Sequence, residues 1–187
     1  MNLGWLAWGV WLGMSLISLG IPGCTPVETP PPAEEATVDQ PDQEAWGWST
    51  RITRLGRKRA EIKAAHFQKF DLSRKTELDG GVEVLFYDRT GEKQVSKLTS
   101  ERAQMDEETS NMLVFGKVIL VSTDSTHLET DSLAWERETD KITGNGTVTL
   151  RRPDGVETGV GFEASSDLKR WSMHQVITRL GSPDSLQ

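Results

Sequence analysis

The side chains that could do chemistry are dispersed along the chain rather than grouped. The histidines, His66, His127 and His174, lie far apart, and none has a cysteine or a second histidine at the spacing of a zinc site. Gly159–Ala164 formally matches a dinucleotide-binding fingerprint, but it leads into no predicted helix and Glu163 would repel a pyrophosphate. The remaining carboxylates fall at predicted turns and polar strand faces. We therefore expect a protein that is not an enzyme and that holds no metal and no cofactor.

Cys24 is the one residue whose position suggests a covalent modification, because a lone cysteine forms neither an intrachain disulfide nor a cysteine-rich zinc site. It follows an uncharged apolar run, Leu3 to Ile21, whose helical length of roughly 28 Å is close to the thickness of a bilayer core. Ile21–Cys24 resembles a bacterial lipobox, in which the cysteine is lipidated. Residues 1–23 are therefore predicted to be a signal peptide cleaved before lipidated Cys24, an uncleaved transmembrane anchor, or a buried apolar helix.

Composition divides the rest of the chain. Residues 24–45 are rich in proline and acidic side chains and contain no basic residue, which predicts a disordered, self-repelling linker. Residues 46–181 are expected to form one folded domain, and residues 182–187 a tail.

A repeated pattern organises the predicted domain. Leu98–Asp106 is followed by Gly116–Val121, and thirty residues later Leu128–Glu136 is followed by Gly144–Leu150. A fixed period of this kind indicates one supersecondary unit that occurs several times. Each unit has two β-prone runs separated by Gly, Asn, Asp or Thr, and the strands alternate apolar and polar side chains. We predict an all-β fold, an antiparallel β-jellyroll or open sandwich of repeated strand pairs.

The alternation also predicts where the strands bend and turn. The parity of the apolar positions changes within two of the repeated runs, so we expect a bulge or a bend near Glu101 and near Asp131 that keeps both halves facing inward. Hairpin turns are predicted at Thr90–Gly91, Asn145–Gly146 and Asp154–Gly155.

The inward apolar stripe has two interpretations. It is either a closed hydrophobic core or the lining of a groove that admits acyl chains. Each buried CH₂ contributes about 0.8 kcal/mol, so one fatty chain would contribute on the order of 10 kcal/mol before ordering is subtracted. The stripe consists of Val82, Val84, Phe86, Val118, Leu120, Leu133, Trp135, Val148, Leu150 and Phe162.

A basic run contrasts with the acidic balance of the whole chain. The formal net charge is −7, which argues against a nucleic-acid-binding protein. The run is nevertheless either a solvated strand face or a site for anionic headgroups or an acidic partner. Its members are Arg51, Arg54, Arg57, Lys58, Arg59 and Lys63.

From Trp48 to Gly181 the sequence resembles the LptC-type lipopolysaccharide export proteins of the OstA-like β-jellyroll family. The matching blocks are Gly80–Val84, Leu85–Asp88, Gly116–Val118, Leu128–Trp135, Gly146–Val148 and Gly159–Glu163. The resemblance implies a periplasmic carrier, anchored to the inner membrane by lipidated Cys24 or an uncleaved helix. Such a carrier takes lipopolysaccharide from the permease subunits of an inner-membrane ABC transporter and passes it to a periplasmic jellyroll bridge protein. A non-enzymatic lipoprotein adaptor that binds no lipid is the alternative.

Two predicted edge strands, Trp48–Leu55 and Trp171–Thr178, offer backbone groups for partners to pair with. The family implies that the C-terminal edge meets the bridge protein and the N-terminal edge meets the transporter. The residues assigned to these edges are Ile52, Arg54, Met173, Gln175, Val176 and Ile177.

Overall fold

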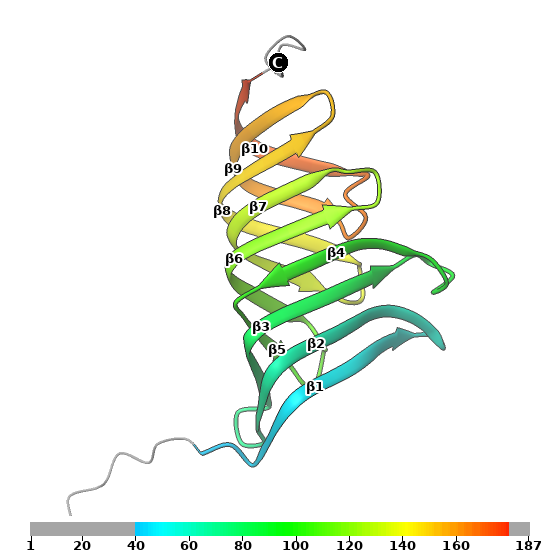
Figure 1. The fold of residues 1–187 in the computed structure, drawn as a ribbon, viewed down its shortest axis with the longest axis vertical. Coiled ribbons are helices and arrows are strands. Elements are labelled where there is room, and N and C mark those ends of the chain that lie inside the picture. The colour runs from blue at the N-terminus through cyan, green and yellow to red at the C-terminus, as the bar shows by residue number, and fades with distance from the viewer. Residues whose placement is uncertain (1–39, 180–187) are drawn as a thin grey trace, which may run out of the picture. The chain divides into compact units, whose positions relative to one another are not determined.

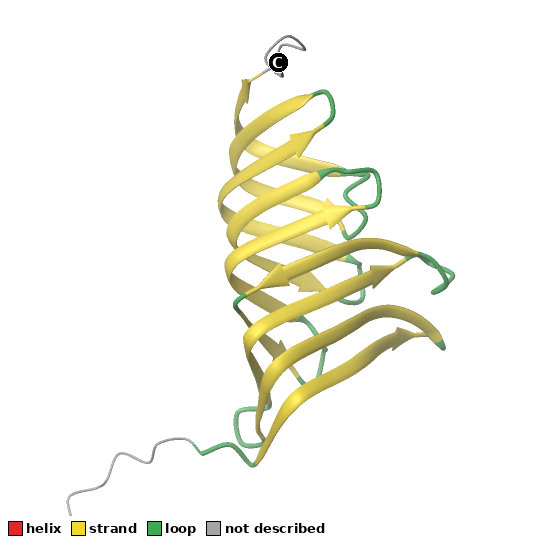
Figure 2. Cartoon of the chain, in the orientation of Figure 1, coloured by secondary structure: helices red, strands yellow, loops and turns green. Residues whose placement is uncertain are grey.

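The computed structural model describes residues 40–179 of the 187-residue chain. The predicted apolar segment, Cys24, the linker up to residue 39 and the tail lie outside the described residues. Ten antiparallel strands form one sheet, which confirms the predicted all-β class (Figures 1 and 2). The strands are β1 (Gln43–Arg54), β2 (Arg57–Phe70), β3 (Lys75–Tyr87), β4 (Gln94–Ser100), β5 (Arg102–Asp106), β6 (Met112–Ser122), β7 (His127–Glu136), β8 (Lys141–Arg152), β9 (Gly155–Ser165) and β10 (Trp171–Arg179).

The strand order, β1-β2-β3-β4-β6-β7-β8-β9-β10, follows the chain, with β5 pairing beside β4 to both β3 and β6. β4 pairs with the second half of β3 and of β6, whereas β5 pairs with their first halves. The long strands are thus bent between two half-strands, and the sheet folds into two facing layers (Figure 1). We call them the β4 layer and the β5 layer after the strand that each contains.

Bulges produce the bends at the predicted places. In the pairing of β6 with β7, Gly116 and Lys117 stand opposite the single residue Asp131, and both have a positive φ, +80° and +47°. Glu101 separates β4 from β5. Its Oε1 forms an ion pair with Lys117 Nζ across the bend, at 2.7 Å. The hydrogen bond between Lys117 and Glu101, followed by the attraction of their charges, lowers the pKa of Glu101 and raises the pKa of Lys117. The prediction of a bulge or bend is confirmed at both places, with a bend at Glu101 and a bulge opposite Asp131.

The hairpin turn predicted at Asn145–Gly146 is wrong. Both residues lie within β8, where together they face Gly161 of β9 in another bulge. The residues of β8 on either side continue to pair with β7 and β9, so the chain bends there without reversing. The turns predicted at Thr90–Gly91 and Asp154–Gly155 are confirmed, since they join β3 to β4 and β8 to β9.

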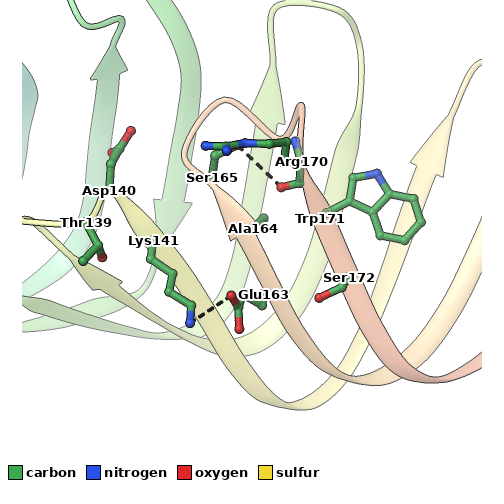
Figure 3. A pocket seen from close by; sticks show the side chains of 9 residues that line it. All are labelled: Thr139, Asp140, Lys141, Glu163, Ala164, Ser165, Arg170, Trp171 and Ser172. Carbon is green, nitrogen blue, oxygen red and sulfur yellow. Dashed lines mark hydrogen bonds and ion pairs between the residues drawn. The ribbon is translucent and has the colours of Figure 1, made fainter.

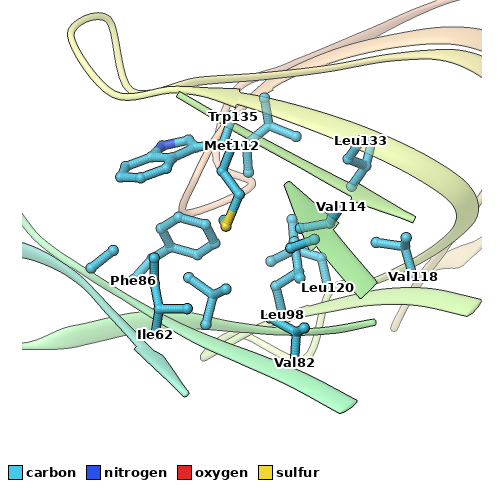
Figure 4. Close-up of a cluster of buried hydrophobic side chains, with 14 of the residues drawn as sticks. Ile62, Val82, Phe86, Leu98, Met112, Val114, Val118, Leu120, Leu133 and Trp135 are labelled. Atoms are coloured by element: carbon cyan, nitrogen blue, oxygen red, sulfur yellow. The ribbon is translucent and has the colours of Figure 1, made fainter. Parts of the chain in front are cut away.

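The core lies between the two layers. Every residue of the predicted inward stripe is between 0 and 3% exposed and belongs to one continuous cluster. Figure 4 shows part of this cluster, including Val82, Leu120 and Leu133. Phe86 of the β4 layer meets Trp135 of the β5 layer edge to face, with ring centroids 5.3 Å apart. Met112 and Ile62 pack in the same cluster. The interior between the layers is therefore occupied by side chains that contact one another.

Candidate functional site

The apolar interior is positioned by the bulges. Each bulge adds one residue to one of two paired strands, which shifts the pairing register and lets the apolar positions on both sides of the bend face the interior. In β6, Val114 precedes the bulge and Val118 follows it, and both are buried. In β7, Leu128 and Leu133 stand on either side of the shift, and both are buried as well. Fatty chains could contact this surface only if the two layers moved apart, since the side chains now fill the space.

Polar contacts join the two layers along one side of the core. Arg59 of β2 donates one hydrogen bond to Asp140 Oδ2, at 2.8 Å, and another to the carbonyl oxygen of Asp88, also at 2.8 Å. Asp140 lies in the turn between β7 and β8 and also accepts hydrogen bonds from Ser166 Oγ and Trp135 Nε1. Arg59 is only 8% exposed, so its charge is held mostly out of water and depends on these partners.

Two further contacts cross between the same parts of the fold. Ser96 of β4 donates to the carbonyl oxygen of Ser166, in the turn between β9 and β10, at 2.5 Å. Arg54 of β1 donates to the carbonyl oxygen of Glu138, in the turn between β7 and β8. We call these contacts, together with Arg59–Asp140, the clasp.

Leu168 reinforces the clasp from within. It lies in the turn between β9 and β10 and is 3% exposed, packed in the core cluster. Its φ of +56° is unfavourable for leucine, so burial of the side chain must compensate for backbone strain. Neither Leu168 nor the clasp was predicted from the sequence, because a charged turn carries no signal that one of its residues points into the core.

The turns on the β5 layer also border a surface cavity of about 370 Å³ (Figure 3). It lies beside the clasp and includes Asp140, Ser165 and Trp171 in its lining. Lys141 and Glu163 form an ion pair there, at 2.9 Å, and so neutralise one another. Nowhere in residues 40–179 do three or more histidine, cysteine or carboxylate side chains gather as a metal site would require.

The predicted partner edges are the outer strands of the sheet, since β1 and β10 end the strand order. The side chains assigned to these edges differ in exposure. Ile52 points into the core, Met173 packs partly against it, and Gln175 and Val176 are exposed. Ile177 is paired through its backbone with Thr158 of β9.

An ionisable cluster fastens β1 to its neighbours. His66 of β2 contacts the carboxylates of Glu44 on β1, at 2.8 Å, and Asp79 on β3, at 3.0 Å. Trp46 stacks on the His66 ring with centroids 5.3 Å apart. The hydrogen bond with Glu44, followed by that with Asp79, raises the pKa of His66 above its ordinary value. The protonated form of His66 is therefore the form that the two carboxylates favour.

Comparison with known proteins identifies the family. A family model described as lipopolysaccharide-assembly, LptC-related, matches residues 15–179. A search of curated proteins found no match. In the part of the chain that the structure describes, no helix is long and apolar enough to cross a membrane. The matched family is one of periplasmic, inner-membrane-anchored components of lipopolysaccharide transport, and its members are carriers rather than known enzymes. The chain belongs to the LptC family of lipopolysaccharide-assembly proteins.

Proposed function

We propose that this protein carries lipopolysaccharide by admitting its acyl chains between the β4 and β5 layers. The observation that carries the proposal is the continuous apolar stripe that lines both layers from β3 to β9. Acyl chains would replace contacts between the layers with contacts to lipid of the same apolar kind, so opening exposes little apolar surface to water. The groove that opening would create is lined by the inward stripe, which consists of Val82, Val84, Phe86, Val118, Leu120, Leu133, Trp135, Val148, Leu150 and Phe162.

Entry of lipid requires the clasp to open. The clasp contacts are polar and lie on one side of the core. On the other side the backbone of the bent strands runs through the bulges and connects the two layers covalently. This arrangement favours movement about the bulges, with the turns bearing Asp140 and Ser166 moving away from β2 and β4.

We propose that the two edge strands connect the carrier to its partners. An exposed edge can add a strand from another protein through backbone hydrogen bonds. β10, with Met173, Gln175, Val176 and Ile177, would pair with a periplasmic jellyroll bridge protein. β1, with Ile52 and Arg54, would meet the permease subunits of the inner-membrane ABC transporter.

The anchor belongs to the same proposal. Residues 1–23 would act as a signal peptide or as an uncleaved helix. The linker predicted over residues 24–45 would act as a spacer as far as β1, which begins at Gln43 and so extends the domain predicted at 46–181 toward the N-terminus. If the signal peptide is cleaved, Cys24 would carry the lipid that holds the protein on the inner membrane. Mass spectrometry of the membrane fraction distinguishes the two forms, because an intact peptide that begins at Met1 excludes the lipoprotein.

Photo-crosslinking from adjacent residues of β6 tests the carrier. Leu120 is fully buried between the layers, whereas Val121 is 37% exposed on the outer face. A photoreactive residue at 120 should form adducts with lipopolysaccharide in cells that export it, and the same residue at 121 should not. Position 150, buried on β8, provides an independent repeat.

The filled interior favours one alternative, a lipoprotein adaptor that binds partners through its edges and carries no lipid. The adaptor requires no separation of the layers. It predicts no lipid adduct from position 120 or 150 in cells whose export is active, and that result would refute the carrier.

A further inference from the structure

Arginines from distant parts of the sequence meet beside the clasp. A cavity of about 240 Å³ is bordered by five of them, although the whole chain has a net charge of −7. Three come from the β1–β2 hairpin, one from the turn between β3 and β4, and one from the turn between β9 and β10. The lining residues are Arg54, Leu55, Arg57, Arg59, Arg89, Thr139, Asp140, Ser165 and Arg170. We call this cavity the arginine pocket.

Of the basic run predicted from the sequence, only Arg54, Arg57 and Arg59 line the arginine pocket. Lys58 forms an ion pair with Glu61 and lies over the ring of Tyr87, 3.6 Å from its centroid. Lys63 forms an ion pair with Glu83. These contacts place the two lysines on the sheet surface, and the pocket takes arginines only.

The β1–β2 hairpin explains how two of the arginines come together. Its turn consists of Leu55 and Gly56, both with a positive φ, which is the geometry of a tight two-residue hairpin. Arg54 and Arg57 are therefore direct partners in the strand register. Arg54 forms an ion pair with Glu138, at 3.5 Å, so its charge is partly balanced, whereas the charge of Arg57 remains in the pocket.

The carboxylate in the lining does not neutralise the pocket. Asp140 is the acidic residue of the lining, and it is already bound to Arg59. Within residues 40–179, no side-chain hydrogen bond or ion pair involves the guanidinium groups of Arg57, Arg89 or Arg170. The pocket thus presents the unneutralised positive charge of Arg57, Arg89 and Arg170.

We propose that the arginine pocket binds a phosphate monoester, and that in the working protein this phosphate belongs to the headgroup of the carried glycolipid. The planar guanidinium fork matches phosphate oxygens in pairs, which makes arginine a preferred residue for phosphate recognition. The pocket lies beside the clasp, where the interior would open, so a bound headgroup would leave its acyl chains next to the apolar stripe. The assignment to a glycolipid rests on the proposed carrier function, whereas the affinity for phosphate does not.

Two matched double variants of the full-length protein, purified in detergent, test the proposal. Arg57→Gln/Arg170→Gln removes two charges from the arginine pocket. Arg51→Gln/Arg151→Gln removes two from exposed positions elsewhere. The probes are an acylated disaccharide that bears phosphate monoesters, the same glycolipid after enzymatic dephosphorylation, inorganic phosphate and a polyglutamate peptide.

The pocket variant should bind the phosphorylated glycolipid on the order of 100-fold more weakly, about tenfold for each lost charge-assisted contact. The control variant should bind it as the unaltered protein does. The dephosphorylated glycolipid should bind all three proteins with equal affinity. That equality also shows that the variants are folded.

The remaining outcomes are decisive. Equal binding of the phosphorylated glycolipid by the pocket variant and the unaltered protein overturns the proposal but leaves the carrier intact. Arginine-dependent binding of inorganic phosphate without binding of either glycolipid supports the phosphate site and refutes the carrier. If only polyglutamate binding depends on the arginines, the pocket recognises an acidic peptide and the phosphate proposal is overturned.

Discussion

Replacing Asp140 with asparagine should loosen the clasp while keeping the shape of the side chain. Asparagine retains an oxygen for Ser166 or Trp135 but presents no charge to Arg59, whose side chain is 9% exposed. Hydrogen bonds between charged groups contribute about 1.5–3 kcal/mol, and Asp140 is exposed enough, at 27%, for water to replace part of the loss. We expect the free energy of unfolding to fall by about 2 kcal/mol, or Tm by roughly 6 °C.

Urea unfolding and amide hydrogen exchange measure the effect. Exchange should accelerate in residues 137–140 and 166–170, because the clasp holds these turns against the β4 layer. Asp154→Asn is the matched control, since that carboxylate is 71% exposed and its ion pair with Arg152 spans 3.5 Å. The control should change stability by less than about 0.5 kcal/mol.

A double-mutant cycle makes the test specific. Once Arg59 is replaced by methionine, Asp140→Asn should have little further effect, with a coupling energy of at least about 1 kcal/mol. Additive effects of the two substitutions, or unchanged exchange in residues 166–170, would refute the reasoning that this ion pair joins the layers.

Three further predictions concern the bend, the first edge and the last edge. Gly116→Ala should lower the free energy of unfolding by about 1–3 kcal/mol, because φ is +80° and a Cβ would lie 2.6 Å from Glu101 Oε2. Urea unfolding measures the change. Gly146→Ala is the control, since a Cβ at Gly146 would meet open space. The raised pKa of His66 means that its contribution to stability is present below its unfolded pKa and is lost as pH rises through the folded pKa. His66→Gln should therefore lose more stability at pH 5.5 than at pH 8.5, and an equal loss at both would exclude the linkage. A proline within residues 173–177 should weaken capture of the bridge protein in a pull-down; undiminished capture would argue against pairing through β10.

Local physics explains which parts of the fold the sequence could predict. Alternation places Val82, Val84 and Phe86 on one face whatever the neighbouring strands are, because successive side chains of a strand point to opposite faces. Near Glu101 and Asp131 the apolar positions change from even to odd residue numbers, and this change predicted the places where the strands bend. Asn145–Gly146 was misassigned because the same residue types suit a hairpin turn and a bulge. Only the pairing of β8 with both neighbours distinguishes the two.

The sequence by itself determined the antiparallel class, the inward stripe and the bends, since each depends on residues close together in the chain. Tertiary structure alone decided that Arg59 meets Asp140, that Ser96 meets Ser166, and that Arg89 and Arg170 join the hairpin arginines in one pocket. Arg59 and Asp140, Ser96 and Ser166, and the hairpin arginines and Arg170 come from opposite layers and are separated by long stretches of sequence. Their contacts arise only because the bent strands bring the turns of one layer against the strands of the other.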